Sequence, residues 1–66
     1  MAKASLGTKC ESDQVCPESG KWEATYLYNG KKVTDMDEDY KWHEQGDVFR
    51  QWNGKTVSWE LIEYKE

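Results

Sequence analysis

The sequence predicts a small all-β domain, and three observations lead to that prediction. First, residues 28–33 (Tyr-Asn-Gly-Lys-Lys-Val) recur twenty-four positions later as residues 52–57 (Trp-Asn-Gly-Lys-Thr-Val). Second, Asn-Gly accepts positive φ at both central positions of a type I′ turn, so each copy predicts a tight antiparallel hairpin. Third, apolar and polar residues alternate through residues 21–28, which is the period of a strand with one buried face.

The first part of the chain predicts a lead-in and one hairpin. Residues 1–20 combine small residues with turn formers, so we expect a flexible N-terminal segment, followed by a β domain over residues 21–66. A two-residue turn at the first Asn-Gly would set Tyr26 opposite Val33, an aromatic beside a β-branched residue. Four residues of this segment share one face of the predicted strand: Trp22, Ala24, Tyr26 and Tyr28.

The second part predicts an acidic loop at residues 35–39, a short strand at 40–43 and a hairpin of 48–52 with 55–64. The hairpin would pair Val48 with Trp59 and would leave apolar residues on both faces, which indicates a closed barrel or pairing between copies. The oligomeric state stays open. We expect a small antiparallel meander or an SH3-like, partly open barrel of four to five strands, with no helix. One face would hold Val48, Val57, Trp59 and Leu61, and the other Phe49, Ile62 and Tyr64.

Size and charge narrow the classes of function. The 66 residues make one domain, and four Trp, four Tyr and one Phe must supply most of its core because aliphatic residues are few. The net charge of −4 repels a phosphate backbone, so we expect no nucleic-acid binding, and a basic protein surface is the natural partner. No apolar run is long enough to span a membrane, and no signal-peptide pattern is present. We expect a cytoplasmic protein, or a secreted one if the chain is a processed mature form.

The reactive residues do not form a recognisable catalytic or metal motif. Cys10 and Cys16 have the wrong spacing for a zinc site, and both a disulfide between them and two free thiols remain open. The acidic loop lacks the glycine and glutamate of a calcium-binding loop. His43 has no nucleophile in a known motif near it. We therefore expect no enzyme, no metal and no cofactor.

Two resemblances can be stated. The run Cys-Pro-Glu-Ser-Gly-Lys-Trp at residues 16–22, then Gly-Asp-Val-Phe at 46–49 and a final Trp59, resembles small bacterial and phage proteins that include immunity proteins of polymorphic toxin systems. Arg50 stands where that pattern has proline. This resemblance implies a small β fold that binds a partner without catalysis.

The second resemblance is to the chitin-binding domains of bacterial chitinases. Residues 28–33 are followed by Tyr40 and Trp42, then Gln-Gly-Asp at 45–47 and a closing Trp-Glu-Leu at 59–61, in the order of those domains. The interval from tyrosine to tryptophan is shorter here, and the proline that follows is missing. The resemblance implies that Tyr40 and Trp42 stack on sugar rings.

Together these observations predict a non-catalytic binding module. We expect a protein partner, and carbohydrate is the alternative, because exposed aromatic side chains can anchor a protein or stack on a sugar. An acidic rim would speed encounter with a basic partner. The predicted binding residues are Tyr40, Trp42, Trp52, Asp37 and Asp39.

Overall fold

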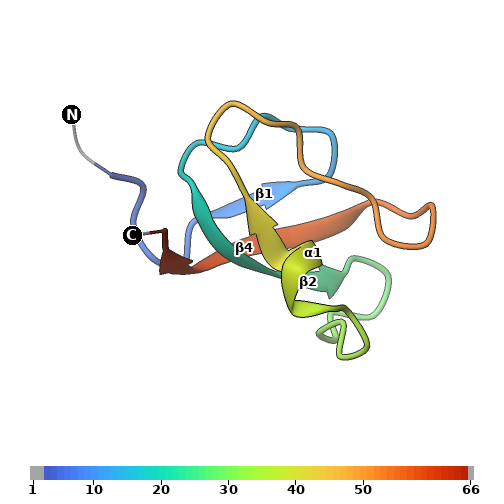
Figure 1. Cartoon of the computed structure of the whole chain (residues 1–66). Helices are drawn as coiled ribbons and strands as arrows, with labels where there is room; N and C mark the ends of the chain where they lie inside the picture. The colour runs from blue at the N-terminus through green and yellow to red at the C-terminus, as the bar shows by residue number, and fades with distance from the viewer. Residues whose placement is uncertain (1–2, 66) are drawn as a thin grey trace.

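A computed structural model of the chain describes residues 3–65 and shows a curled, four-stranded antiparallel half-barrel (Figure 1). The order in the sheet is β1-β4-β2-β3. The predicted all-β class and the partly open barrel are confirmed; the simple meander is not, because β4 lies between β1 and β2. The elements are β1 (Lys9–Glu11), β2 (Gly20–Tyr26), α1 (Glu38–Lys41), β3 (Trp42–His43) and β4 (Val57–Tyr64).

The core lies on the concave face of β2 and β4. Alternate residues of both strands are buried, as the period of two predicts. Ala24 lies opposite Trp59, so a small residue leaves room for an indole across the pair. Four apolar residues of these strands are almost completely buried: Trp22 on β2, and Val57, Trp59 and Leu61 on β4.

Two irregular segments, residues 13–15 and 48–49, pair with each other outside the named strands. The N–H of Asp13 donates to the carbonyl of Phe49 at 2.9 Å, and the N–H of Phe49 donates to the carbonyl of Gln14 at 2.9 Å. Val15 and Val48 form an isolated antiparallel bridge between these segments. The predicted pairing of Val48 with Trp59 is therefore wrong, because β4 uses its two edges for β1 and β2 instead.

This pairing reverses the predicted faces of two neighbours. Phe49 is 1% exposed and packs in the core, whereas Val48 is 53% exposed. The ring of Phe49 lies 4.8 Å from that of Trp22, edge to face, and 6.1 Å from that of Trp59, nearly parallel. The prediction that Phe49 lies on the face opposite Trp59 is wrong for the same reason as the register.

The two Asn-Gly turns differ. In the second, Asn53 and Gly54 both have positive φ (52° and 73°), and Trp52 and Lys55 exchange two backbone hydrogen bonds of 3.0 and 2.9 Å, as predicted. In the first, only the glycine has positive φ (70°), and the N–H of Tyr26 donates to the carbonyl of Lys31. The first loop is therefore two residues longer than predicted.

The longer first loop shifts its pairing. The N–H of Val33 donates to the carbonyl of Ala24 at 2.9 Å, so Ala24 rather than Tyr26 faces Val33. Within this loop Oδ1 of Asn29 accepts the N–H of Lys31 at 2.9 Å, the side-chain turn that Asn commonly forms. Because the shift is two residues, the inward and outward faces stay as predicted.

The predicted boundary at residue 20 does not separate two parts of the structure. β1 lies inside the expected lead-in and pairs with β4, with Cys10 opposite Trp59. Ser12 is buried, and its Oγ accepts the N–H of Val57 at 3.0 Å. Cys16 is also buried in the core. A flexible lead-in is thus wrong for residues 9–16, while Met1 and Ala2, with Glu66 of the β domain, lie outside the described residues.

A single helical turn stands where the third strand was predicted to begin. Asp37 has the extended backbone of an N-cap, and acidic residues follow it in the first turn with Lys41 in the last, which suits the helix dipole. Glu38 pairs with Lys21 of β2 and with Lys41. Only Trp42 and His43 are then left to form β3. The helix is too short to span a membrane, and no longer helix occurs within residues 3–65.

Candidate functional site

Four aromatic rings form a continuous row at one end of the sheet, which we call the aromatic strip: Tyr28, Tyr26, Trp52 and Tyr40. The ring centroids of Tyr28 and Tyr26 are 5.3 Å apart. The indole N–H of Trp52 donates to the hydroxyl of Tyr26 at 3.2 Å. Trp52 then meets Tyr40 edge to face at 5.3 Å. The strip thus joins the loop after β2, the second turn and α1; in Figure 1 the loop after β2 (green) and the second turn (orange) leave the sheet on the same side.

The inner end of the strip is fixed to the core. Tyr40 lies over Trp59 with 6.4 Å between ring centroids and 28° between ring planes. Its hydroxyl donates to the carbonyl of Gln51 at 2.7 Å, and the indole N–H of Trp59 donates to the carbonyl of Arg50 at 2.9 Å. These contacts order the rings before any ligand arrives, which reduces the entropy lost on binding.

A cation lies over a ring at each end of the strip. Nζ of Lys55 is 5.1 Å from the ring centroid of Tyr28, and the guanidinium of Arg50 is 4.8 Å from that of Tyr40. Among residues 3–65 neither cation is in an ion pair with a carboxylate. Four lysines of the described chain are in such pairs: Lys21, Lys32, Lys41 and Lys65. The strip therefore carries two cations that are in no ion pair of the described chain, although the net charge of the protein is −4.

The structure brings together only part of the predicted binding set. Tyr40 and Trp52 touch each other within the strip. Trp42 is half-buried on β3, opposite Lys21, and makes no ring contact with the strip. Asp37 and Asp39 are exposed at the start of α1, and the N–H of Tyr40 donates to the carbonyl of Asp37.

Sequence reasoning missed half of the strip and both of its cations. The sequence pattern places Tyr26 and Tyr28 on one face of a strand with Trp22 and does not mark them as binding residues, although Tyr28 is 71% exposed. The signal that could have found them is the repeated phrase itself. Each copy places an aromatic residue before a turn and a lysine three positions later, and antiparallel strands bring those turns to one end.

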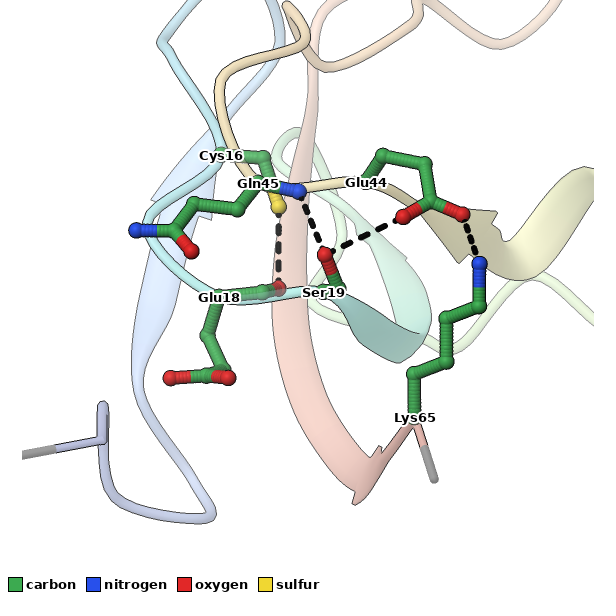
Figure 2. Close-up of polar contacts among 6 residues, drawn as sticks. All are labelled: Cys16, Glu18, Ser19, Glu44, Gln45 and Lys65. Carbon is green, nitrogen blue, oxygen red and sulfur yellow. Dashed lines mark hydrogen bonds and ion pairs between the residues drawn. The ribbon is translucent and has the colours of Figure 1, made fainter.

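The cysteines are both free thiols in this structure, so the disulfide alternative between Cys10 and Cys16 is not the one formed. Sγ of Cys16 donates to the carbonyl of Glu18 at 3.1 Å (Figure 2). Burial raises the pKa of both thiols above the ordinary value. A buried thiol with a raised pKa is a poor nucleophile.

One polar cluster resembles a catalytic arrangement in composition. Figure 2 shows Ser19, Glu44 and Lys65 in a row: the Ser19 hydroxyl donates to Glu44 at 3.2 Å, and Lys65 pairs with the other oxygen of that carboxylate. The hydrogen bond from Lys65 lowers the pKa of Glu44, so the carboxylate is a weak base. The N–H of Gln45 also donates to the Ser19 hydroxyl at 2.7 Å. The cluster therefore clamps the end of β4 to the segment after β3.

The single histidine is buried in aromatic surroundings. His43 is 4% exposed, and its ring lies 4.5 Å from that of Trp59 and 4.9 Å from that of Phe49. Nδ1 lies 3.2 Å from the carbonyl of Lys41, to which it can only donate, so Nε2 is the unprotonated nitrogen and has no partner. Burial lowers the pKa of the imidazole below its ordinary value. His43 is thus a neutral core residue.

The rest of the described chain offers no enclosed site. Residues 3–65 contain no pocket, and no three of their histidine, cysteine or acidic side chains gather as metal ligands would. The surface feature with the most organised chemistry is therefore the aromatic strip. Comparison with family models, with curated proteins and with solved structures gives no match.

Proposed function

We propose that the protein is a non-catalytic binding module, an SH3-like half-barrel that uses its aromatic strip to bind a protein partner. The observation that supports the proposal most is the pre-ordered row of rings from exposed Tyr28 to Tyr40. Aromatic residues and arginine dominate the binding energy of protein interfaces, and the strip offers both. An immunity-like or phage-encoded factor would act in this way, by occupying a partner rather than transforming it.

The proposal places the module in a reducing compartment such as the cytoplasm. Two free thiols, one partly exposed, persist more readily there than in an oxidising environment. The carbohydrate alternative is less well supported, because a sugar ring stacks on an open aromatic face and cations lie over two rings of the strip. Lys55 lies over Tyr28, and Arg50 lies over Tyr40.

Selection from a random peptide library on the immobilised protein tests the proposal. We expect enriched peptides to lose binding to the Tyr28→Ala variant by about tenfold, as for loss of one aromatic contact. Tyr28 is exposed, so this variant should fold. Lys9→Ala is the matched control, because Lys9 is exposed on β1 and belongs to none of the strip contacts.

Retention on chitin and cellulose beads is measured in parallel. Binding to beads that Tyr28→Ala or Trp42→Ala abolishes, together with no enriched peptide, would replace the protein-partner proposal with the carbohydrate one. Enriched peptides that bind Tyr28→Ala as well as the unaltered protein would show that the aromatic strip is not the binding surface.

A further inference from the structure

We propose that the segment bound by the aromatic strip is acidic: an extended polypeptide whose carboxylates pair with Lys55 and Arg50 and whose carbonyls accept hydrogen bonds from the tyrosine hydroxyls. This inference rests on the proposed function and names the chemistry of the partner. It differs from the expectation of a basic partner, which followed from the net charge of −4.

The hydrogen-bonding groups that the strip can offer a ligand are mainly donors. The N–H of Trp52 and the O–H of Tyr40 are already used, on Tyr26 and on the carbonyl of Gln51. The hydroxyl of Tyr26 accepts from Trp52 and keeps its own proton to donate. Tyr28 has a hydroxyl without a partner in the described chain, and the two cations carry donors alone. A ligand rich in acceptors fits such a surface.

The two cations are available because they rest on rings and not on carboxylates. Four of the nine basic residues are in ion pairs in the described chain, and Lys55 and Arg50 are not among them. Lys55 and Arg50 stand at opposite ends of the strip. A ligand carboxylate can approach either of them without first breaking an ion pair.

The predicted acidic loop, residues 35–39, runs into α1, and one of its four acidic residues is in ion pairs. Within residues 35–39, Glu38 is already paired with Lys21 and Lys41. Asp37 caps the helix by its backbone position and is not part of the strip. The charged side chains that lie over rings of the strip are those of Lys55 and Arg50, whereas Asp39 adjoins Tyr40 along the chain.

A single-stranded nucleic acid also presents acceptors, but the ring geometry favours a polypeptide. Bases bind by stacking on open aromatic faces. The ring of Tyr40 is contacted by Trp59, Trp52 and Arg50, and that of Tyr28 by Tyr26 and Lys55. Two cations also neutralise few phosphates on a chain of net charge −4.

The test uses three blocked nonapeptides built from Glu-Ala-Pro, Gln-Ala-Pro and Lys-Ala-Pro repeats, and a fluorescein-labelled oligothymidine. Each is titrated into the isotope-labelled full chain and followed by amide and indole NMR shifts. We expect the Glu peptide to bind at least about tenfold more tightly than the Lys peptide, with shifts at the Trp52 indole and at residues 26–31. Added salt should weaken the binding.

Charge reversal within the strip gives the variant test. Lys55→Glu should lower the affinity for the Glu peptide by about tenfold and raise that for the Lys peptide. Lys9→Glu is the matched control, because it changes the net charge equally at an exposed β1 position, and it should change either affinity by less than about twofold.

The outcomes separate this inference from the proposed function. Equal or tighter binding of the Lys peptide, or binding of oligothymidine at the strip, overturns the inference. If no designed peptide binds while the library yields neutral or basic peptides that depend on Tyr28, the inference falls and the proposed function stands. If the library yields none and no peptide shifts the Trp52 indole, both fall.

Discussion

Replacing Phe49 and Val48 separately tests how the half-barrel is built, because the structure puts these neighbours in opposite environments. Phe49 is 1% exposed and lies 4.8 Å from the ring of Trp22 and 4.9 Å from that of His43. A volume-conserving apolar change costs up to about 1.5 kcal/mol, and each lost aromatic pair adds about 0.5–1.5 kcal/mol. Phe49→Leu should therefore cost about 2–3 kcal/mol. Val48 is 53% exposed, so Val48→Ala should stay within about 0.5 kcal/mol.

These magnitudes suit a chain of this size. At about 0.05–0.15 kcal/mol per residue, a 66-residue domain has about 3–10 kcal/mol of stability, so the leucine variant should still fold. Its melting temperature should fall by roughly 10–20 °C, as followed by circular dichroism, and urea unfolding should give the free energy. A larger loss of stability for Val48→Ala than for Phe49→Leu would show that residues 48–52 pair with β4 as a hairpin. It would refute the pairing of residues 13–15 with residues 48–49.

Three further predictions concern single buried or constrained residues. Burial lowers the pKa of His43, so the unfolded chain binds a proton at this residue more readily than the folded chain does. The free energy of unfolding should therefore be constant above the ordinary pKa of 6.5 and fall as the pH drops below it. If the His43→Gln variant shows the same dependence of this free energy on pH, measured by urea unfolding, the explanation is wrong. Gly20→Ala should cost about 3 kcal/mol, because a Cβ there would lie 2.3 Å from a carbonyl oxygen of β4. Gly46→Ala should cost about 1–2 kcal/mol, because Gly46 has a φ of 93° but a Cβ there would meet no neighbouring atom. The reverse order in thermal unfolding would contradict the packing at β2. In the folded protein a thiol reagent should label Cys10 before buried Cys16, and equal rates without denaturant would contradict the burial.

The core strands could be predicted because their signal is local. Alternation assigns Trp22, Val57, Trp59 and Leu61 to one side whatever strand lies beside them, and all are buried in the structure. The turn at residues 53–54 also follows a local signal, because Asn and Gly accept positive φ at little cost, although the same dipeptide at 29–30 lies in a longer loop.

The strand partners could not be predicted, because an Asn-Gly turn determines only the residue pair that flanks it. It does not determine how many further residues of the two segments pair with each other. Trp52 and Lys55 pair, yet two residues later Val57 pairs with Tyr26 of β2, far away in sequence. The choice depends on the non-local burial of Phe49 and on Ser12, whose hydroxyl accepts the N–H of Val57. No pattern within a short window contains that information.

The candidate site depends on the repeat of residues 28–33 at residues 52–57 and on the pairing of β2 with β4, which the sequence does not reveal. β2 ends where β4 begins, with Tyr26 opposite Val57, so both Asn-Gly loops leave the sheet at the same end. The aromatic residue of one copy then meets the lysine of the other: Lys55 lies over Tyr28. Each copy alone would expose one ring and one cation. Their antiparallel arrangement joins them to Tyr40 in a single row, which explains why Trp42, on β3, does not belong to it.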